Sequence, residues 1–225
     1  MTGWRQHMDR NTDARSAMVD LAYALDAPQG GAVPADYRAV LAAALQARLP
    51  WLAQTPGAGV HRLRLVAGGG GQALLARRTR LVLRLPRERL AQARALEGAT
   101  LMLDDHALTV GSMQARELLP WRTLYAHIVA VGAVGAVGAE TAPDEAAFMA
   151  EVDEELRTLG VACRTVCGRH QVLQAGTLQG YSLMLDGLSA PDSLRLLEQG
   201  IGGHRRLGCG LFVPHKSAAA VGTPP

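Results

Sequence analysis

The chain has 225 residues, of which 48% are hydrophobic and 19% charged, and its formal net charge is +3. This length suits one large domain or two small ones of about 100 residues each, and the composition excludes a wholly disordered chain. No apolar run approaches the roughly 18 residues that span a bilayer, and the polar N-terminus is unlike a secretory signal, so we expect a cytoplasmic protein without membrane contact.

The first half of the chain alternates between strand and helix patterns. Residues 1–16 are polar and without pattern, and we expect a flexible extension there. Alternation from Val19 to Leu25 predicts a strand, and helical spacing after Pro34 predicts a helix that Pro50 ends. The remaining elements expected in this half are strands at 61–65, 73–85, 100–103 and 107–110 and a second helix from Pro86 to Gly98.

The second half repeats this order. Its expected elements are a strand at 124–131, a helix that Thr141 and Asp144 cap, strands at 161–173 and 177–185, a helix from Ser189 to Gly200, and a closing strand at 208–213. The repeated order, strand–helix–strand–strand–helix–strand, describes a ferredoxin-like unit, in which both helices cover one face of an antiparallel sheet. The sequence therefore predicts an α+β fold of two tandem ferredoxin-like (RRM-like) βαββαβ units, at residues 17–117 and 118–216, with a flexible tail at 217–225.

Charge is unevenly distributed along the chain. Between Gly59 and Arg94 nine arginines stand against one acid, whereas between Glu140 and Gly160 seven acids stand against one arginine. A phosphate-bearing partner could use the basic segment, and we expect its arginines to be partly exposed. Two ordinary solvated faces are the alternative explanation.

A glycine-rich segment follows the last predicted helix. Residues 200–210 contain five glycines in eleven positions, together with His204, Arg205 and Arg206. Glycine permits close backbone approach, so successive N–H groups could face an anion while the arginines contact phosphate. The segment runs from helix to strand, unlike the common nucleotide-binding loops, which run from strand to helix. The alternative is a glycine-rich helix cap and turn.

This segment, followed by Gly-Cys-Gly-Leu-Phe-Val, resembles the signature of the CRISPR repeat-processing endoribonucleases of the RAMP superfamily. Residues 180–185, 192–196 and 207–217 are similar to the MYXAN subtype of that family. The resemblance implies a metal-independent, cofactor-free endoribonuclease in which the 2′-hydroxyl attacks the adjacent phosphate and leaves a 2′,3′-cyclic phosphate. The implied partners are CRISPR repeat RNA, as precursor and as mature crRNA, and other subunits of a type I effector complex.

The implied reaction needs a base at the 2′-hydroxyl, an acid at the leaving oxygen and cations at phosphorus. Relatives of this family often carry a histidine on or beside the first helix, where this chain has Tyr37 and no histidine. We predict His61 as the general base, with its pKa lowered by the neighbouring Arg62 and Arg64, and His204 as its rival. Tyr37 could position the 2′-hydroxyl or act as a weak acid.

The residues expected to bind RNA lie in the basic segment, the glycine-rich segment and the end of the last strand: Arg62, Arg64, Gly200, Gly202, Gly203, Arg205, Arg206 and Lys216. No metal site is expected. Cys163, Cys167 and His170 with distant Cys209 are spaced too widely for a typical zinc site, so these thiols are better explained as buried hydrophobes. His127, which alternates within a strand, is interpreted as a core histidine.

Two alternatives to the nuclease stay open. One is a non-cleaving RAMP-type subunit that binds guide RNA in a CRISPR effector complex, which the missing helix histidine favours. The other is a small-molecule enzyme on a duplicated ferredoxin-like scaffold, since a fold does not determine a function.

Overall fold

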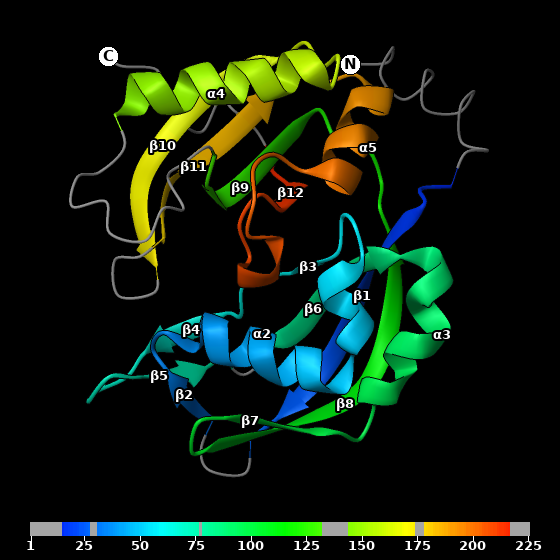
Figure 1. Ribbon diagram of the computed structural model, residues 1–225, viewed down its shortest axis with the longest axis vertical. Coiled ribbons are helices and arrows are strands. Elements are labelled where there is room, and N and C mark those ends of the chain that lie inside the picture. The colour runs from blue at the N-terminus through cyan, green and yellow to red at the C-terminus, as the bar shows by residue number, and fades with distance from the viewer. Residues whose placement is uncertain (1–14, 28–30, 77, 132–143, 174–177, 217–225) are drawn as a thin grey trace.

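The structure is a computed structural model that describes residues 15–27, 31–76, 78–131, 144–173 and 178–216. Its strands form two main sheets, one from each half of the chain, and Figure 1 shows these halves one above the other. We call β1 to β8 with their helices the first unit, and β9 to β12 with their helices the second unit. The domain boundaries drawn from the sequence stay a prediction. Of the predicted extension, Arg15 and Ser16 are described, and Ser16 is buried.

The first unit holds a five-stranded antiparallel sheet in the order β3-β6-β1-β8-β7. Its strands are β1 (Met18–Asp26), β3 (Gly59–Val60), β6 (Arg80–Pro86), β7 (Thr100–Leu103) and β8 (His106–Glu117). Its helical segments are α2 (Tyr37–Arg48), η1 (Pro50–Gln54), η2 (Arg87–Arg89), α3 (Leu90–Ala93) and η3 (Arg94–Leu96). Leu41 and Leu45, one turn apart on α2, and Leu96 share one core with the inward residues of β1, so these helical segments cover a single face of the sheet.

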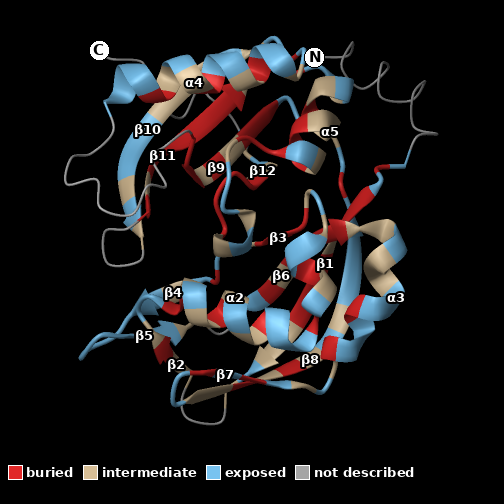
Figure 2. Ribbon diagram, in the orientation of Figure 1, coloured by how far each residue is buried: buried red, intermediate tan, exposed pale blue. Residues whose placement is uncertain are grey.

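The second unit repeats this arrangement in a four-stranded sheet of order β10-β11-β9-β12. Its elements are β9 (Thr123–Val129), α4 (Glu145–Thr158), β10 (Arg164–Leu173), β11 (Leu178–Asp186), α5 (Ala190–Gln199), η6 (Arg205–Leu207) and β12 (Phe212–Pro214). Phe148 and Val152 of α4 pack with Leu197 of α5 in one core. In Figure 2 buried residues concentrate in β1, β6 and β11, whereas α2 and α4 alternate between buried and exposed positions. Both sheets have the strand order of a ferredoxin-like unit, which confirms the predicted α+β tandem fold.

Several predicted boundaries in the first unit are wrong. The first helix begins at Tyr37, because Pro34 pairs with Gln72 in a small sheet. That sheet has the order β2 (Ala32–Pro34), β5 (Gln72–Leu75), β4 (Leu65–Ala67). The strand expected at 73–85 is two strands, because β5 ends at Leu75 and β6 begins at Arg80, and between them the N–H of Thr79 donates to the Ala76 carbonyl. Residues 61–64, expected in a strand, lie between β3 and β4 instead, and the second predicted helix is a short α3 flanked by η2 and η3.

Predicted helix ends in the second unit agree better with the structure. The Asp144 and Ser189 side chains accept hydrogen bonds from the backbone N–H groups of Ala146 and Asp192, as N-caps do. Gly200 caps the end of α5 with a φ of 67°. Thr141 lies outside the described residues. None of the helices within the described residues is long and apolar enough to cross a membrane.

Candidate active site

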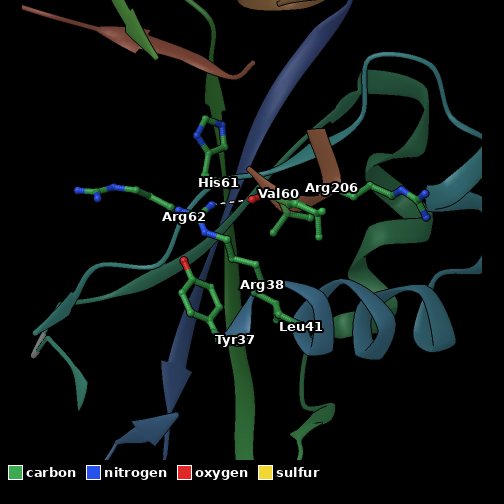
Figure 3. A pocket seen from close by; sticks show the side chains of 8 residues that line it. Tyr37, Arg38, Leu41, Val60, His61, Arg62 and Arg206 are labelled. Atoms are coloured by element: carbon green, nitrogen blue, oxygen red, sulfur yellow. Dashed lines mark hydrogen bonds between the residues drawn. The ribbon is translucent and has the colours of Figure 1, made fainter. Parts of the chain in front are cut away.

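A small pocket forms where α2, the end of β3 and η6 meet, so both units contribute to it (Figure 3). Its lining residues are Tyr37, Arg38, Leu41, Val60, His61, Arg62, Arg206 and Leu207. The Arg38 guanidinium spans the pocket, because its Nη1 donates to the Leu207 carbonyl at 2.6 Å. The lining side chains leave almost no enclosed space for a small molecule, whereas small-molecule sites enclose roughly 300–1,000 Å³. The pocket therefore suits a surface contact with a large substrate better than an enclosed metabolite.

His61 lies on the first-unit side of this pocket, directly after β3. Its Nε2 is 3.5 Å from Oδ1 of Asp20, a residue of β1, and its side chain is only 13% exposed. Burial lowers the pKa of His61, and this effect outweighs Asp20, which raises it. The charges that lower it further belong to Arg84 and Arg205. The predicted lowering is therefore present, but its attribution to Arg62 and Arg64 is wrong, because the arginines that act on the His61 ring are Arg84 and Arg205, whereas Arg62 and Arg64 are exposed.

Tyr37, at the start of α2, is buried and fixed in place. The backbone N–H of Leu63 donates to its Oη at 2.7 Å, and the Arg38 guanidinium lies 5.7 Å from its ring centroid. Burial raises the pKa of Tyr37, so the phenol is protonated at neutral pH. In Figure 3 the Tyr37 ring and the His61 ring lie on opposite sides of Arg38. The structure thus brings both predicted residues to one pocket.

The glycine-rich segment does not present a row of unpaired N–H groups, which corrects the anion site expected there. The N–H of Gly202 donates to Oε2 of Glu155 at 2.7 Å. The other glycine N–H groups donate to backbone carbonyls: Gly200 to Leu196, Gly203 to Ala130, Gly208 to Arg205, and Gly210 to Ile128. These bonds hold the segment against α4, α5 and β9. In this structure the glycines therefore shape the loop and do not offer free N–H groups to an anion.

Arg205 is also an internal residue rather than a solvent-facing cation. Its guanidinium donates to four carbonyls, of Gly57 in the first unit and of Glu198, Gln199 and Gly210 in the second. Burial, with some help from Arg84, lowers the pKa of Arg205 to about 10. Arg205 therefore ties the loop to both units, and its expected contact with phosphate is not available in this arrangement.

The neighbouring residues of that loop differ in their positions. Arg206 is exposed at the pocket rim, where its Nη1 donates to Oε1 of Gln46 at 2.8 Å. His204 is exposed, adopts a left-handed backbone with φ of 58°, and does not line the described pocket. Lys216 is exposed beyond β12. Three side chains of this loop can carry a positive charge, and of these Arg206 is the one that lines the pocket together with His61.

Three polar residues near the pocket have positions that the sequence patterns did not predict. Neither Arg38 nor Asp20 belongs to a motif that marks it as a functional residue in the sequence. The third is His127, which is half-buried: burial lowers its pKa to about 4, and the nearby charges of Arg62, Arg38 and His61 contribute to the lowering, so this histidine lies close to the charged groups of the site. An acid within the buried strand β1 was the available signal, because a buried carboxylate requires a partner.

The cysteines lie in separate places. Cys163, just before β10, and Cys167, on β10, are half-buried and pack against the core of the second unit. Cys209 is fully buried in another cluster, with Ile128, Ala130 and Leu178. Burial raises the pKa of each of these thiols to about 11.

Replacing Gly200 with alanine is expected to destabilise the fold by more than about 1 kcal/mol. Gly200 has φ of 67° and ψ of −166°, and an added Cβ would lie 2.2 Å from the Gly210 carbonyl oxygen. Gly203→Ala is the matched control, because nothing lies within 4 Å of its Cβ position. Urea unfolding of both variants measures the difference, and an equal stability of the two would contradict the proposed shaping role.

The sequence model of the Cas6 family, described as "Cas6 Crispr", matches residues 19–217. The chain is 37% identical over 205 residues to the CRISPR-associated endonuclease Cas6 of Myxococcus xanthus, covering 90% of this chain and 84% of the relative.

Two solved structures share the fold. A Cas6-related protein from Pyrococcus furiosus superposes with a TM-score of 0.61 at 13% identity, covering 87% of this chain and 98% of that one. A RAMP protein described as binding different RNA substrates superposes with a TM-score of 0.62 at 15% identity, covering 86% of this chain and 98% of that one.

Proposed function

The chain belongs to the Cas6 family of CRISPR-associated proteins, and from this premise we propose that it is a metal-independent endoribonuclease that cleaves CRISPR repeat RNA and retains the mature guide RNA. The observation that carries the proposal is a buried histidine with a lowered pKa, His61, in a pocket that exposed arginines of both units border. A neutral imidazole accepts a proton, and the arginines attract phosphate.

The residues of the pocket support a reaction by internal transesterification. His61 takes the proton of the 2′-hydroxyl as the 2′-oxygen forms a bond to phosphorus. The bond between phosphorus and the 5′-oxygen breaks, which leaves a 2′,3′-cyclic phosphate and a 5′-hydroxyl. Tyr37, protonated because burial raises its pKa, is the candidate donor to the leaving oxygen. Arg62 and Arg206 stabilise the charge that develops on the phosphate oxygens.

Incubation of the purified protein with a CRISPR repeat RNA in EDTA tests this proposal. Cleavage with a 2′,3′-cyclic phosphate on the upstream product and a 5′-hydroxyl on the downstream product is expected, and the guide product should co-elute with the protein in gel filtration. Dependence on a divalent metal, or 3′-hydroxyl ends, would contradict the mechanism.

A non-cleaving subunit that binds guide RNA is the second candidate function. The absence of a histidine from α2, where Tyr37 stands, favours it. The same incubation separates the two candidates, because a binding subunit shifts the repeat RNA on a native gel and leaves it intact. An RNA that is neither shifted nor cut would contradict both.

The rate of cleavage should fall to half of its plateau value only below pH 6.5. A general base must be neutral, and burial holds the pKa of His61 below the ordinary value of 6.5. Protonation therefore begins to remove the base only as pH falls through that lowered value. Single-turnover rates across pH 4–8 measure the midpoint. A midpoint above 6.5 would exclude His61 as the base.

Affinity for repeat RNA should fall steeply with salt, and Arg62→Ala should make the dependence shallower. Each phosphate contact to single-stranded RNA adds about 0.7 to the slope of log K against log salt, through release of counterions. Arg62 is exposed at the pocket, so its removal is expected to lower the slope by about that amount. Arg157→Ala, on the acidic helix α4, is the control and should leave the slope unchanged. Equal slopes for all three proteins would exclude Arg62 from the RNA interface.

A further inference from the structure

Asp20 connects the candidate base to the interface between the two units. Its Oδ1 lies 3.5 Å from Nε2 of His61. Arg84 binds the same carboxylate in a bidentate manner: its Nε donates to Oδ1 at 2.8 Å and its Nη2 donates to Oδ2 at 2.9 Å. The Asp20 side chain is 18% exposed and that of Arg84 only 1%. Asp20 is thus held rigidly between a buried guanidinium and an imidazole.

Arg84 in turn is held by the second unit. Its Nη1 donates to the carbonyls of Leu197, near the end of α5, and Phe212, at the start of β12, each at 2.9 Å. These two segments flank the glycine-rich loop, which contributes Arg206 to the pocket. The position of the Asp20 carboxylate, and with it the orientation of the His61 ring, therefore depends on the packing of the loop-bearing unit.

The surroundings of Nε2 determine which tautomer of the His61 ring is favoured. Nε2 is buried and makes no hydrogen bond within the described residues, and its nearest charged neighbour there is Oδ1 of Asp20 at 3.5 Å. A carboxylate only accepts hydrogen bonds, so it favours the tautomer with its proton on Nε2. That tautomer leaves the lone pair on Nδ1. The nitrogen that accepts a substrate proton is then Nδ1.

We propose that Asp20 is a positioning residue, which holds neutral His61 in the Nε2–H tautomer and thereby presents Nδ1 as the base. This inference rests on the proposed function, in which His61 is the general base. Arg84 keeps the Asp20 carboxylate in place and couples it to the second unit. Asp20 itself acts through His61 and does not touch the substrate.

The charges around the ring are consistent with this role. Contacts with His61 and Arg84 outweigh the effect of burial and hold the pKa of Asp20 well below its ordinary value, so the carboxylate is ionised at neutral pH. The groups that act on His61 from the packed elements are Asp20 of β1, Arg84 of β6 and Arg205 of η6, and His127 of β9 lies near it. Asp20 supplies the negative charge among them.

The test combines the tautomer of His61 with the kinetics of one isosteric variant. Long-range proton–nitrogen NMR spectra of protein with ¹⁵N-labelled histidine report which nitrogen carries the proton, and His61→Gln identifies the His61 signals by their loss. The Nε2–H form is expected in the wild type. Asp20→Asn should mix the two tautomers, lower the single-turnover rate about 10- to 100-fold and leave RNA affinity unchanged. Because Asp20 raises the pKa of His61, the acid limb of the pH–rate profile should also move to lower pH.

Glu198→Gln is the matched control. Glu198 is another carboxylate between the two units, and its Oε1 accepts hydrogen bonds from Ser16 Oγ and the Ala17 N–H, just before β1. This variant makes the same change from acid to amide without a contact to His61, so tautomer, rate and pH profile should all stay as in the wild type. If Asp20→Asn matches Glu198→Gln in all three measurements, Asp20 does not position His61.

The wild-type spectrum decides the matter even if Asp20→Asn fails to fold, because a dominant Nδ1–H tautomer of His61 would overturn the inference. The spectrum is recorded without RNA and does not depend on cleavage. Cleavage by His61→Gln at the wild-type rate would instead overturn the proposed role of His61 as the base. The two failures are therefore distinguishable.

Discussion

His61→Ala is expected to lower the single-turnover cleavage rate of a CRISPR repeat RNA by about 10²- to 10⁴-fold, the range typical for the loss of a general base. Affinity for the RNA should change little, because the imidazole is mostly buried and the exposed arginines at the pocket supply the phosphate contacts. Single-turnover kinetics at saturating protein separate the chemical step from binding.

His204→Ala is the control for this prediction. His204 is exposed and lies in the same glycine-rich segment, but it does not line the described pocket, so its loss should leave the rate within a few-fold of the wild type. A dead His204→Ala combined with an active His61→Ala would reverse the assignment. If both variants cleave at the wild-type rate, histidine does not transfer the proton.

Arg84→Met is expected to destabilise the fold by about 3–5 kcal/mol, because it leaves the Asp20 carboxylate without its main partner in a buried setting. It also removes the two hydrogen bonds that Arg84 donates to carbonyls of the second unit. Methionine preserves much of the volume, so most of the loss should come from the unpaired charge and the orphaned carbonyls. Urea unfolding at pH 7 measures the change.

Arg87→Met provides the comparison, since Arg87 and Glu117 form an ion pair whose side chains are 33% and 47% exposed. Exposed pairs contribute about 0–1 kcal/mol, so the free energy of unfolding of this variant should be close to that of the wild type.

The contribution of Asp20 to the free energy of unfolding also has a defined pH dependence. Its folded pKa is depressed, so its stabilisation is present above the ordinary pKa near 4 and is lost as pH falls toward the folded value. The difference between wild type and Arg84→Met should shrink below about pH 4. A loss for Arg84→Met no larger than that for Arg87→Met would contradict the buried role of Arg84.

The order and type of most elements follow from patterns local to each segment. Apolar residues alternate along β1, and the buried residues of α4 recur four positions apart, so each pattern can be recognised without knowledge of what packs against it. The caps at Asp144 and Ser189 are local in the same sense, because donor and acceptor are two or three residues apart. The duplication, and with it the tandem fold, could therefore be predicted from one sequence.

The roles of the polar residues could not be predicted in this way. Arg62 and Arg84 occur in the same basic segment, yet one is exposed at the pocket and the other is a buried link between the units. Arg84 is buried because Leu197 and Phe212, 113 and 128 positions away, supply carbonyls for its guanidinium. The N–H groups of the glycine-rich segment are likewise occupied by acceptors on α4 and β9. A charged group or an N–H group can face a ligand only if no distant segment of the chain already supplies its hydrogen-bond or ion-pair partner. Only the tertiary contacts determine whether such a partner is present.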